Sequence, residues 1–170
     1  MTCSTENVVV CVNGYHADGL QLTKDLLSNI RVYQYQHDKT IGIKSIAQLT
    51  STILYGKRFF PYYTFTLLAG LDENGKGAVF SYDPVGSFER EQYRAGGSAS
   101  ALIQPFLDSQ IGWKNRDDER PELTIDMASK IAMDAFTSAA ERDIYTGDFI
   151  QLWKITKDGC SLSLLPIRKD

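Results

Sequence analysis

The stretch FFPYYTFTLLAGLDENGKGAVFSYDPVGS, residues 59–87, predicts two β-strands joined by a tight turn. Over 63–67 bulky and polar side chains alternate, which is the period of a strand packed on one face. The dipeptide Asn74-Gly75 follows, and it favours a hairpin because both residues tolerate positive φ. A second strand is expected over 77–82, and Asp83-Pro84-Val85-Gly86 is expected to end it with a turn.

The chain has 170 residues, of which 43% are hydrophobic, so we expect residues 1–170 to form one globular domain. Its net charge is −3 and its basic residues are scattered, which argues against a nucleic-acid partner. No apolar run approaches the ~20 residues that a membrane span needs. Three separated cysteines indicate reduced thiols rather than disulfides, and two histidines are too few for a metal site, so no cofactor is expected.

Before this hairpin the sequence predicts one strand and two helices. The run Val8–Val12 is β-branched throughout and typical of a strand buried on both faces, with a neighbour on each side. A first helix should begin with Asp18 as its N-cap and end in the polar segment 34–39. A second helix should begin with Thr40 as its cap and end at Gly56.

After the hairpin we expect a short strand over 88–94, two more helices and two final strands. Ser98 is the expected cap of the third helix, and Thr124 that of the fourth, which reads as the longest. Strands are expected over 149–155 and 160–167. Paired helices between mainly antiparallel strands indicate an α+β protein in which helices stack on sheets.

Several of these segments together resemble the proteasome beta-type subunits, and among them a non-catalytic member. The resemblance extends from about Val8 to the C-terminus. The residues that carry it are Arg58–Tyr63, Gly75–Val79, Tyr82–Ser87, Ala95–Ser100 and Ser138–Asp143.

The resemblance implies the αββα four-layer sandwich of the N-terminal-nucleophile hydrolases. It also implies assembly with other alpha and beta subunits into stacked rings, indirect contact with polypeptide substrates, and a location in cytoplasm and nucleus. In that family the complex cleaves peptide bonds through N-terminal threonines on other subunits, so this chain is expected to perform no chemistry.

Relative to that family the chain is expected to start late, without the strands that carry the threonine, an acidic residue and a lysine in catalytic members. The Val8 strand would then have an unpaired edge, and the chain alone would be marginally stable or aggregation-prone. Thr2 could expose an α-amine after loss of Met1, but an unstructured N-terminus is the favoured interpretation.

Four residues match positions that support the threonine amine in catalytic relatives: Ser100, Asp143, Thr146 and Gly147. Without the nucleophile we expect them to be vestigial, with Asp143 fixing the loop 143–147. A triad of Ser98 or Ser100 with His16 and Asp143 can be assembled on paper, but no nucleophile elbow accompanies it.

Tyr82, Asp83, Pro84 and Val85 are the candidates for an indirect role. In the family a loop at this place lies against the neighbouring catalytic subunit and helps complete its substrate pocket. Asp83 would present a carboxylate to bound peptide and Pro84 would hold the loop rigid; the alternative is a simple turn.

The cluster Phe59, Phe60, Tyr62 and Tyr63 is open to two interpretations, core packing or a contact between subunits. Two other functions also remain open. The chain could be an N-terminal-threonine endopeptidase subunit whose catalytic strand is absent from it, or a free binding module.

Overall fold

The computed structural model describes residues 2–5 and 7–167. The chain divides into two compact units, the first reaching Gln92 and including 155–160, the second holding 93–154 and the residues from Ser161 onward. The first unit contains seven complete elements, in chain order β1 (Thr2–Thr5), β2 (Val8–Gly14), α1 (His16–His37), α2 (Ile43–Tyr55), β3 (Thr64–Leu71), β4 (Gly77–Tyr82) and β5 (Phe88–Glu91).

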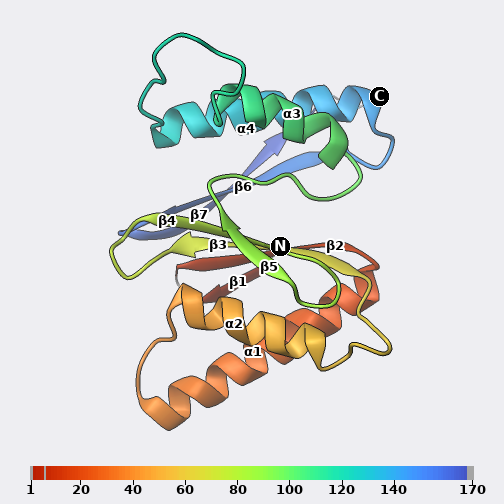
Figure 1. Cartoon of the computed structure of the whole chain (residues 1–170), viewed down its shortest axis with the longest axis vertical. Helices are drawn as coiled ribbons and strands as arrows, with labels where there is room; N and C mark the ends of the chain where they lie inside the picture. Colours follow the sequence, from red (N-terminus) through yellow and green to blue (C-terminus); the bar gives the residue numbers. More distant parts are fainter. Residues whose placement is uncertain (1, 6, 168–170) are drawn as a thin grey trace. The chain divides into compact units, whose positions relative to one another are not determined.

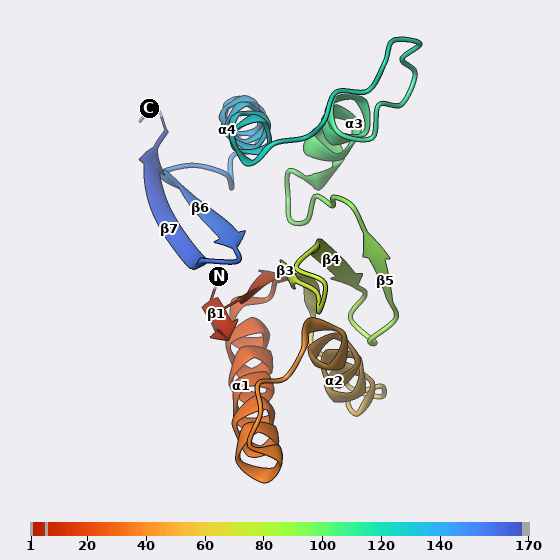
Figure 2. The same ribbon diagram turned by 90° about the vertical axis from the view of Figure 1, so that its left-hand side faces the viewer.

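The five strands of the first unit form one antiparallel sheet in the order of the chain, β1 to β5. Helices α1 and α2 lie side by side on one face of this sheet (Figures 1 and 2). Apolar side chains of both helices meet the sheet in a single core, which includes Leu22, Leu26, Ile30, Ile46, Leu54, Val8, Val10, Leu68 and Phe80.

The hairpin predicted around Asn74-Gly75 is confirmed. Strands β3 and β4 pair from Leu67 opposite Ser81 to Leu71 opposite Gly77. Gly75 takes φ +72°, and its N–H donates to the Asp72 carbonyl at 2.8 Å. Glycine adopts this left-handed conformation without steric cost, which is why the dipeptide predicted the turn.

The alternation predicted over 63–67 is confirmed, but within this stretch the buried residues are the two threonines. Thr64 and Thr66 are fully buried on the face that carries Leu68 into the core, whereas Tyr63 and Phe65 are exposed. Successive strand residues point to opposite faces, so the register that buries Leu68 also buries both threonines.

The expectation of an unpaired edge at Val8 is wrong. β1 pairs antiparallel with β2, with Thr2 opposite Val10 and Cys3 opposite Val9, while β3 pairs with β2 on its other side. The N-terminal segment Thr2–Thr5 is therefore a strand, not the unstructured terminus that was favoured. The side chains of 2–6 lie outside the described part of the chain.

Both expected helix starts in the first unit are wrong. α1 begins at His16 after Tyr15, without a side-chain cap, and the Asp18 carboxylate accepts from the Tyr63 N–H at 2.9 Å instead. α2 begins after Gly42 rather than at Thr40. α1 also continues through most of the polar segment, to His37, so it is longer than α4, the helix that the sequence favoured.

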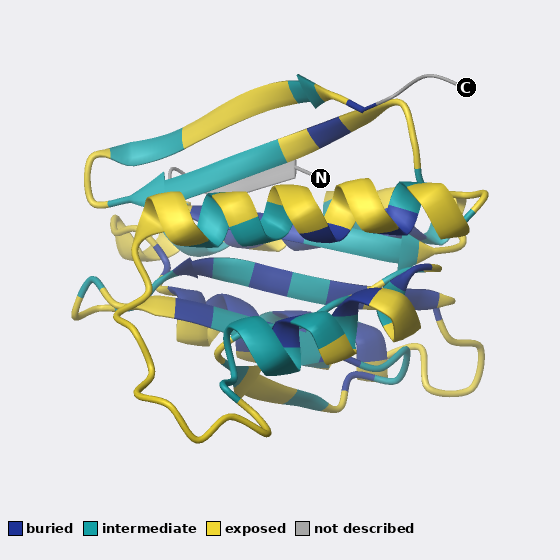
Figure 3. Ribbon diagram, turned by 90° about the horizontal axis from the view of Figure 1, so that it is seen from above, coloured by how far each residue is buried: buried dark blue, intermediate teal, exposed yellow. Residues whose placement is uncertain are grey.

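In the second unit α3 (Ser100–Gln110) packs beside α4 (Ile125–Arg142) through small and branched side chains, among them Ile103, Leu107, Ala135 and Ala139. Ser98 does not cap α3, which begins after Ala99. Thr124 caps α4 as predicted, since its Oγ1 accepts from the Met127 N–H at 3.3 Å. Most of the surface of α4 is exposed or half-buried (Figure 3).

The last two strands, β6 (Phe149–Thr156) and β7 (Gly159–Pro166), pair into a two-stranded sheet. Both were expected from the sequence, within one residue of their bounds. The mixture of helices and sheets confirms the α+β class.

Candidate functional site

Asp143 is the centre of a hydrogen-bonded cluster in the second unit. Its Oδ2 accepts from Ser98 Oγ at 2.5 Å and from Thr146 Oγ1 at 2.6 Å, and its Oδ1 accepts from the Tyr145 N–H at 3.3 Å. The Ser98 and Thr146 hydroxyls hold the pKa of the Asp143 carboxyl below its usual range. The carboxylate thereby fixes the turn that follows α4, as the sequence argument expected.

The four predicted supporting positions are only partly brought together. Thr146 joins Asp143, whereas the Ser100 side chain makes no hydrogen bond among the described residues. The serine that donates to Asp143 is Ser98 rather than Ser100. The sequence had predicted Ser98 as a helix cap because its side chain is short and polar. Gly147 contributes its carbonyl, which accepts from the Phe149 N–H at 3.0 Å.

This cluster contains one carboxylate and two hydroxyls. Both histidines of the chain, His16 and His37, belong to the first unit. No described lysine or histidine makes a hydrogen bond or ion pair with Asp143. Because the pKa of the Asp143 carboxyl is lowered, this carboxylate is a weak base, and its hydrogen bonds orient the loop that follows α4.

The second candidate, the loop Tyr82–Val85, is fastened to α2 within the first unit. Tyr82 is buried, its hydroxyl donates to the Ala47 carbonyl at 2.7 Å, and burial raises its pKa. Gly86 takes φ +91°, and its carbonyl accepts from Ser51 Oγ at 2.6 Å. The loop therefore starts and ends on the helix, which gives it one fixed conformation.

Asp83 closes the turn from inside with one of its two carboxylate oxygens. Oδ1 accepts from the Val85 N–H at 3.0 Å and from the Ser87 N–H at 2.8 Å. Oδ2 has no hydrogen-bond partner among the described residues, and Asp83, Pro84 and Val85 are half-buried. One oxygen thus shapes the loop while the other remains able to meet a ligand.

The aromatic cluster is mostly not core, so the first of its two interpretations is wrong for three of its members. Phe59, Phe60 and Tyr63 are exposed, and only Tyr62 is buried. The Tyr62 hydroxyl donates to Asp25 Oδ2 at 2.8 Å; burial first, and then this bond, raises its pKa to about 12.

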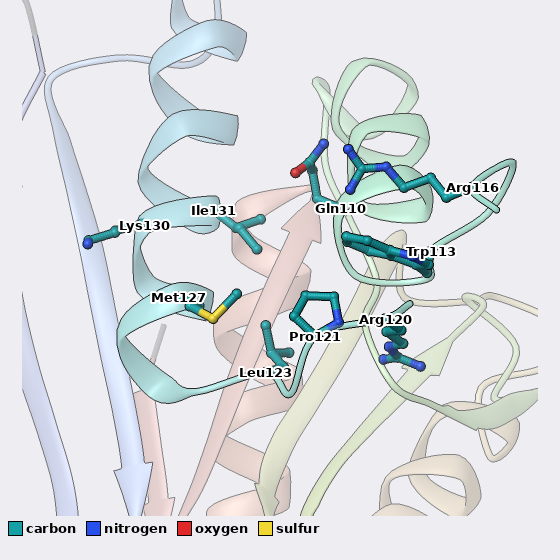
Figure 4. Close-up of a pocket in the computed structure, with 9 residues that line it drawn as sticks. All are labelled: Gln110, Trp113, Arg116, Arg120, Pro121, Leu123, Met127, Lys130 and Ile131. Atoms are coloured by element: carbon teal, nitrogen blue, oxygen red, sulfur yellow. The ribbon is translucent and has the colours of Figure 1, made fainter. Parts of the chain in front are cut away.

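A cavity of about 260 Å³ lies beside α3 and α4 in the second unit. Figure 4 shows Met127 and Ile131 of α4 facing Trp113 and Pro121 of the loop between the two helices. The Arg116 guanidinium lies 4.1 Å from the centre of the Trp113 ring. The lining of the cavity is mainly apolar and includes the cationic side chains of Arg116, Arg120 and Lys130.

Among residues 2–5 and 7–167 no group of three or more His, Cys, Asp or Glu side chains could hold a metal ion. Within the same residues no helix combines the length and the apolar character that crossing a membrane requires. Cys11 is a free thiol, and burial raises its pKa to about 11.

Comparison with known proteins gives a consistent answer over almost the whole chain. A family model described as proteasome subunit matches residues 2–155. The chain is 48% identical to proteasome subunit beta type-1-B of Carassius auratus, over 98% of this chain and 70% of that protein. It is 47% identical to proteasome subunit beta type-1 of Danio rerio, with the same coverage.

A relative from a distant organism shows the same agreement. The chain is 45% identical to proteasome subunit beta type-6 of Saccharomyces cerevisiae, over 97% of this chain and 73% of that protein. In each case the match extends over nearly the whole chain rather than over one motif. The chain therefore belongs to the proteasome subunit family, and within it to the beta-type subunits.

Proposed function

We propose that the chain is a non-catalytic beta subunit of the proteasome core particle, which acts in protein degradation by taking its place in a ring with other alpha and beta subunits. The relatives named beta type-1 and beta type-6 support this choice among the beta subunits. Cytoplasm and nucleus are the proposed locations, and the αββα sandwich of the family is the proposed fold of the assembled subunit.

The observation that carries the non-catalytic role is the closed cluster around Asp143. The Ser98 and Thr146 hydroxyls both donate to Oδ2 of Asp143, and the Tyr145 N–H donates to Oδ1. Such a network stabilises a loop, and a carboxylate whose pKa is lowered is a poor base for activating a hydroxyl. Catalysis by the particle is then performed by other subunits, and this chain carries out no chemistry on polypeptide substrates.

The test is the substitution Asp143→Asn in the assembled particle. It removes the charge of the carboxylate but leaves an oxygen that can accept a hydrogen bond. We expect kcat and KM of the particle for short peptide substrates to be unchanged, because no reacting group is lost. A fall of tenfold or more in kcat at full assembly would contradict the proposal.

We further propose that the loop Tyr82–Val85 borders the substrate pocket of the neighbouring catalytic subunit. The fixed conformation of the loop supports this role, because a preorganised wall costs little entropy when substrate binds. Oδ2 of Asp83 is the group that would meet the substrate, since Oδ1 is held by the turn.

Asp83→Asn tests this second proposal. The asparagine oxygen can replace Oδ1 in the turn, so the loop should keep its shape while it loses its charge. We expect KM to rise for peptides with a basic residue near the cleaved bond and to stay constant for neutral peptides. The matched control is Glu73→Gln, an exposed acid in the turn between β3 and β4; an equal response of both variants would contradict the role of the loop.

A further inference from the structure

The loop between α2 and β3 displays its aromatic side chains to solvent. Phe59 is 99% exposed and Phe60 is 85% exposed, and Tyr55 at the end of α2 and Tyr63 are exposed as well. We call these four residues the aromatic loop. Large apolar groups gathered on a surface are typical of contact sites between proteins, whereas single exposed ones are common and need no explanation.

The aromatic loop is held in place rather than left free. The Arg58 and Phe60 N–H groups each donate at 3.0 Å to a carbonyl three residues earlier, of Tyr55 and Lys57. At the other end, the Tyr63 N–H is bound by Asp18 and the Tyr62 hydroxyl by Asp25, both from α1. Because this backbone is already fixed, binding of a partner would not have to order the loop first.

The charged side chains of the segment 55–63 itself are both cationic and exposed. Lys57 and Arg58 are exposed and directly precede Phe59, and the segment 55–63 contains no acid. The two nearby carboxylates, Asp18 and Asp25, each already accept a hydrogen bond from this segment. Because Asp18 and Asp25 are half-buried while Lys57 and Arg58 are exposed, the charges that the aromatic loop offers to a partner are cationic and fit an acidic partner.

We propose that the aromatic loop docks into an apolar pocket bordered by carboxylates on an adjoining subunit of the particle. Phe59 and Phe60 are the anchors that fill the pocket, and Lys57 and Arg58 pair with its acidic rim. Aromatic anchors with cationic flanks are the residues that carry most of the energy in protein interfaces. This inference rests on the proposed function, because the partner is a subunit of the same particle.

The test is competition for assembly between the wild-type chain and the double variant Phe59→Ala/Phe60→Ala, expressed together and separated by tag. Both side chains are exposed, so the variant should fold as the wild type does. We expect its share of the assembled particle to fall about tenfold or more, as for the loss of interface anchors. The matched control is Tyr35→Ala, because Tyr35 is 91% exposed on α1, outside the aromatic loop.

A second measurement identifies the partner. A photo-reactive benzoylphenylalanine replaces Phe59 in the full chain, and the particle is irradiated and digested. We expect one cross-link to an apolar segment of a different subunit that has Asp or Glu nearby, and we expect Lys57→Glu/Arg58→Glu to abolish it.

The outcomes separate the two proposals. If the wild-type chain enters no particle, the proposed function fails and the docking inference fails with it. If the wild-type chain assembles but the Phe59/Phe60 variant competes equally, only the docking inference fails. A cross-link to a second copy of this chain, or to a partner surface without carboxylates, would also overturn it.

Discussion

At the scale of single residues, two buried hydroxyls conflict with the rule that buried polar groups are hydrogen-bonded. Oγ1 of Thr64 and Oγ1 of Thr66 are buried without a partner in the described part of the chain. A buried donor left unpaired costs about 1–3 kcal/mol. Thr50 is equally buried, but its hydroxyl donates to the Ile46 carbonyl at 2.8 Å.

We therefore expect Thr66→Val to raise the free energy of unfolding by about 1 kcal/mol, since valine has nearly the same shape and suits a strand. Thr50→Val, the matched control, should lower it by about 1 kcal/mol because a satisfied hydrogen bond is lost. Urea unfolding of the purified variants measures both changes. Equal destabilisation by the two substitutions would mean that the Thr66 hydroxyl has a partner after all.

Asp143 predicts a pH dependence of stability. Its folded-state pKa lies below its usual value, so its contribution to stability is complete above the unfolded-state pKa of about 3.9 and is lost as the pH falls through the folded-state pKa. The difference in Tm between the wild type and Asp143→Asn should be largest near neutral pH and should vanish in acid.

The control for this prediction is Asp134→Asn. Asp134 is exposed on α4, and its side chain makes no hydrogen bond among the described residues. The Tm of Asp134→Asn should equal that of the wild type at every pH from neutral to acid. If the difference in Tm between the wild type and Asp143→Asn stays constant over the same pH range, the hydroxyl contacts do not depend on the charge of the carboxylate.

At the scale of elements, the loop after β4 depends on close contact with α2. A Cβ added at Gly86 would lie 2.6 Å from the Ser51 carbonyl oxygen, and φ is +91° there. A Cβ at Gly77, at the start of β4, would meet nothing within 4 Å, and φ there is not positive.

We expect Gly86→Ala to lower the free energy of unfolding by about 1–3 kcal/mol, because the side chain adds backbone strain and a clash. Gly77→Ala should change it by less than about 0.5 kcal/mol, as for an open surface position. Thermal unfolding followed by circular dichroism compares the two. Similar losses for both would contradict the account of the loop as fastened to the helix.

The elements themselves could largely be predicted from the sequence, because periodicity and turn chemistry act over a few residues. The hairpin at Asn74-Gly75 and the cap at Thr124 depend on neighbours close in the chain, and both are confirmed. Asp18 and Ser98 were misassigned as caps because each binds a group 45 residues away. A local sequence pattern cannot reveal which distant group will form a hydrogen bond with a polar side chain.

At the scale of the whole molecule, the pairing of β2 changes what is expected of the free chain. An unpaired edge at Val8 was the reason to predict aggregation, but β1 covers that edge and is itself the edge strand of the sheet. The aromatic loop is an apolar surface that the free chain leaves exposed. Its exposure could not be predicted from the sequence, because Phe and Tyr in a row fit a core and an interface equally well.

The most direct measurement of the central claim uses an intact particle that contains a tagged form of this chain. The particle is treated with a peptide that carries an electrophile reactive toward N-terminal threonines, and the mass of every subunit is then determined. The account predicts that this chain is present in the same amount as its neighbours and keeps its mass, while other beta subunits gain the mass of the peptide. Labelling of this chain, or its absence from the particle, would contradict the claim that it is a structural, non-catalytic subunit.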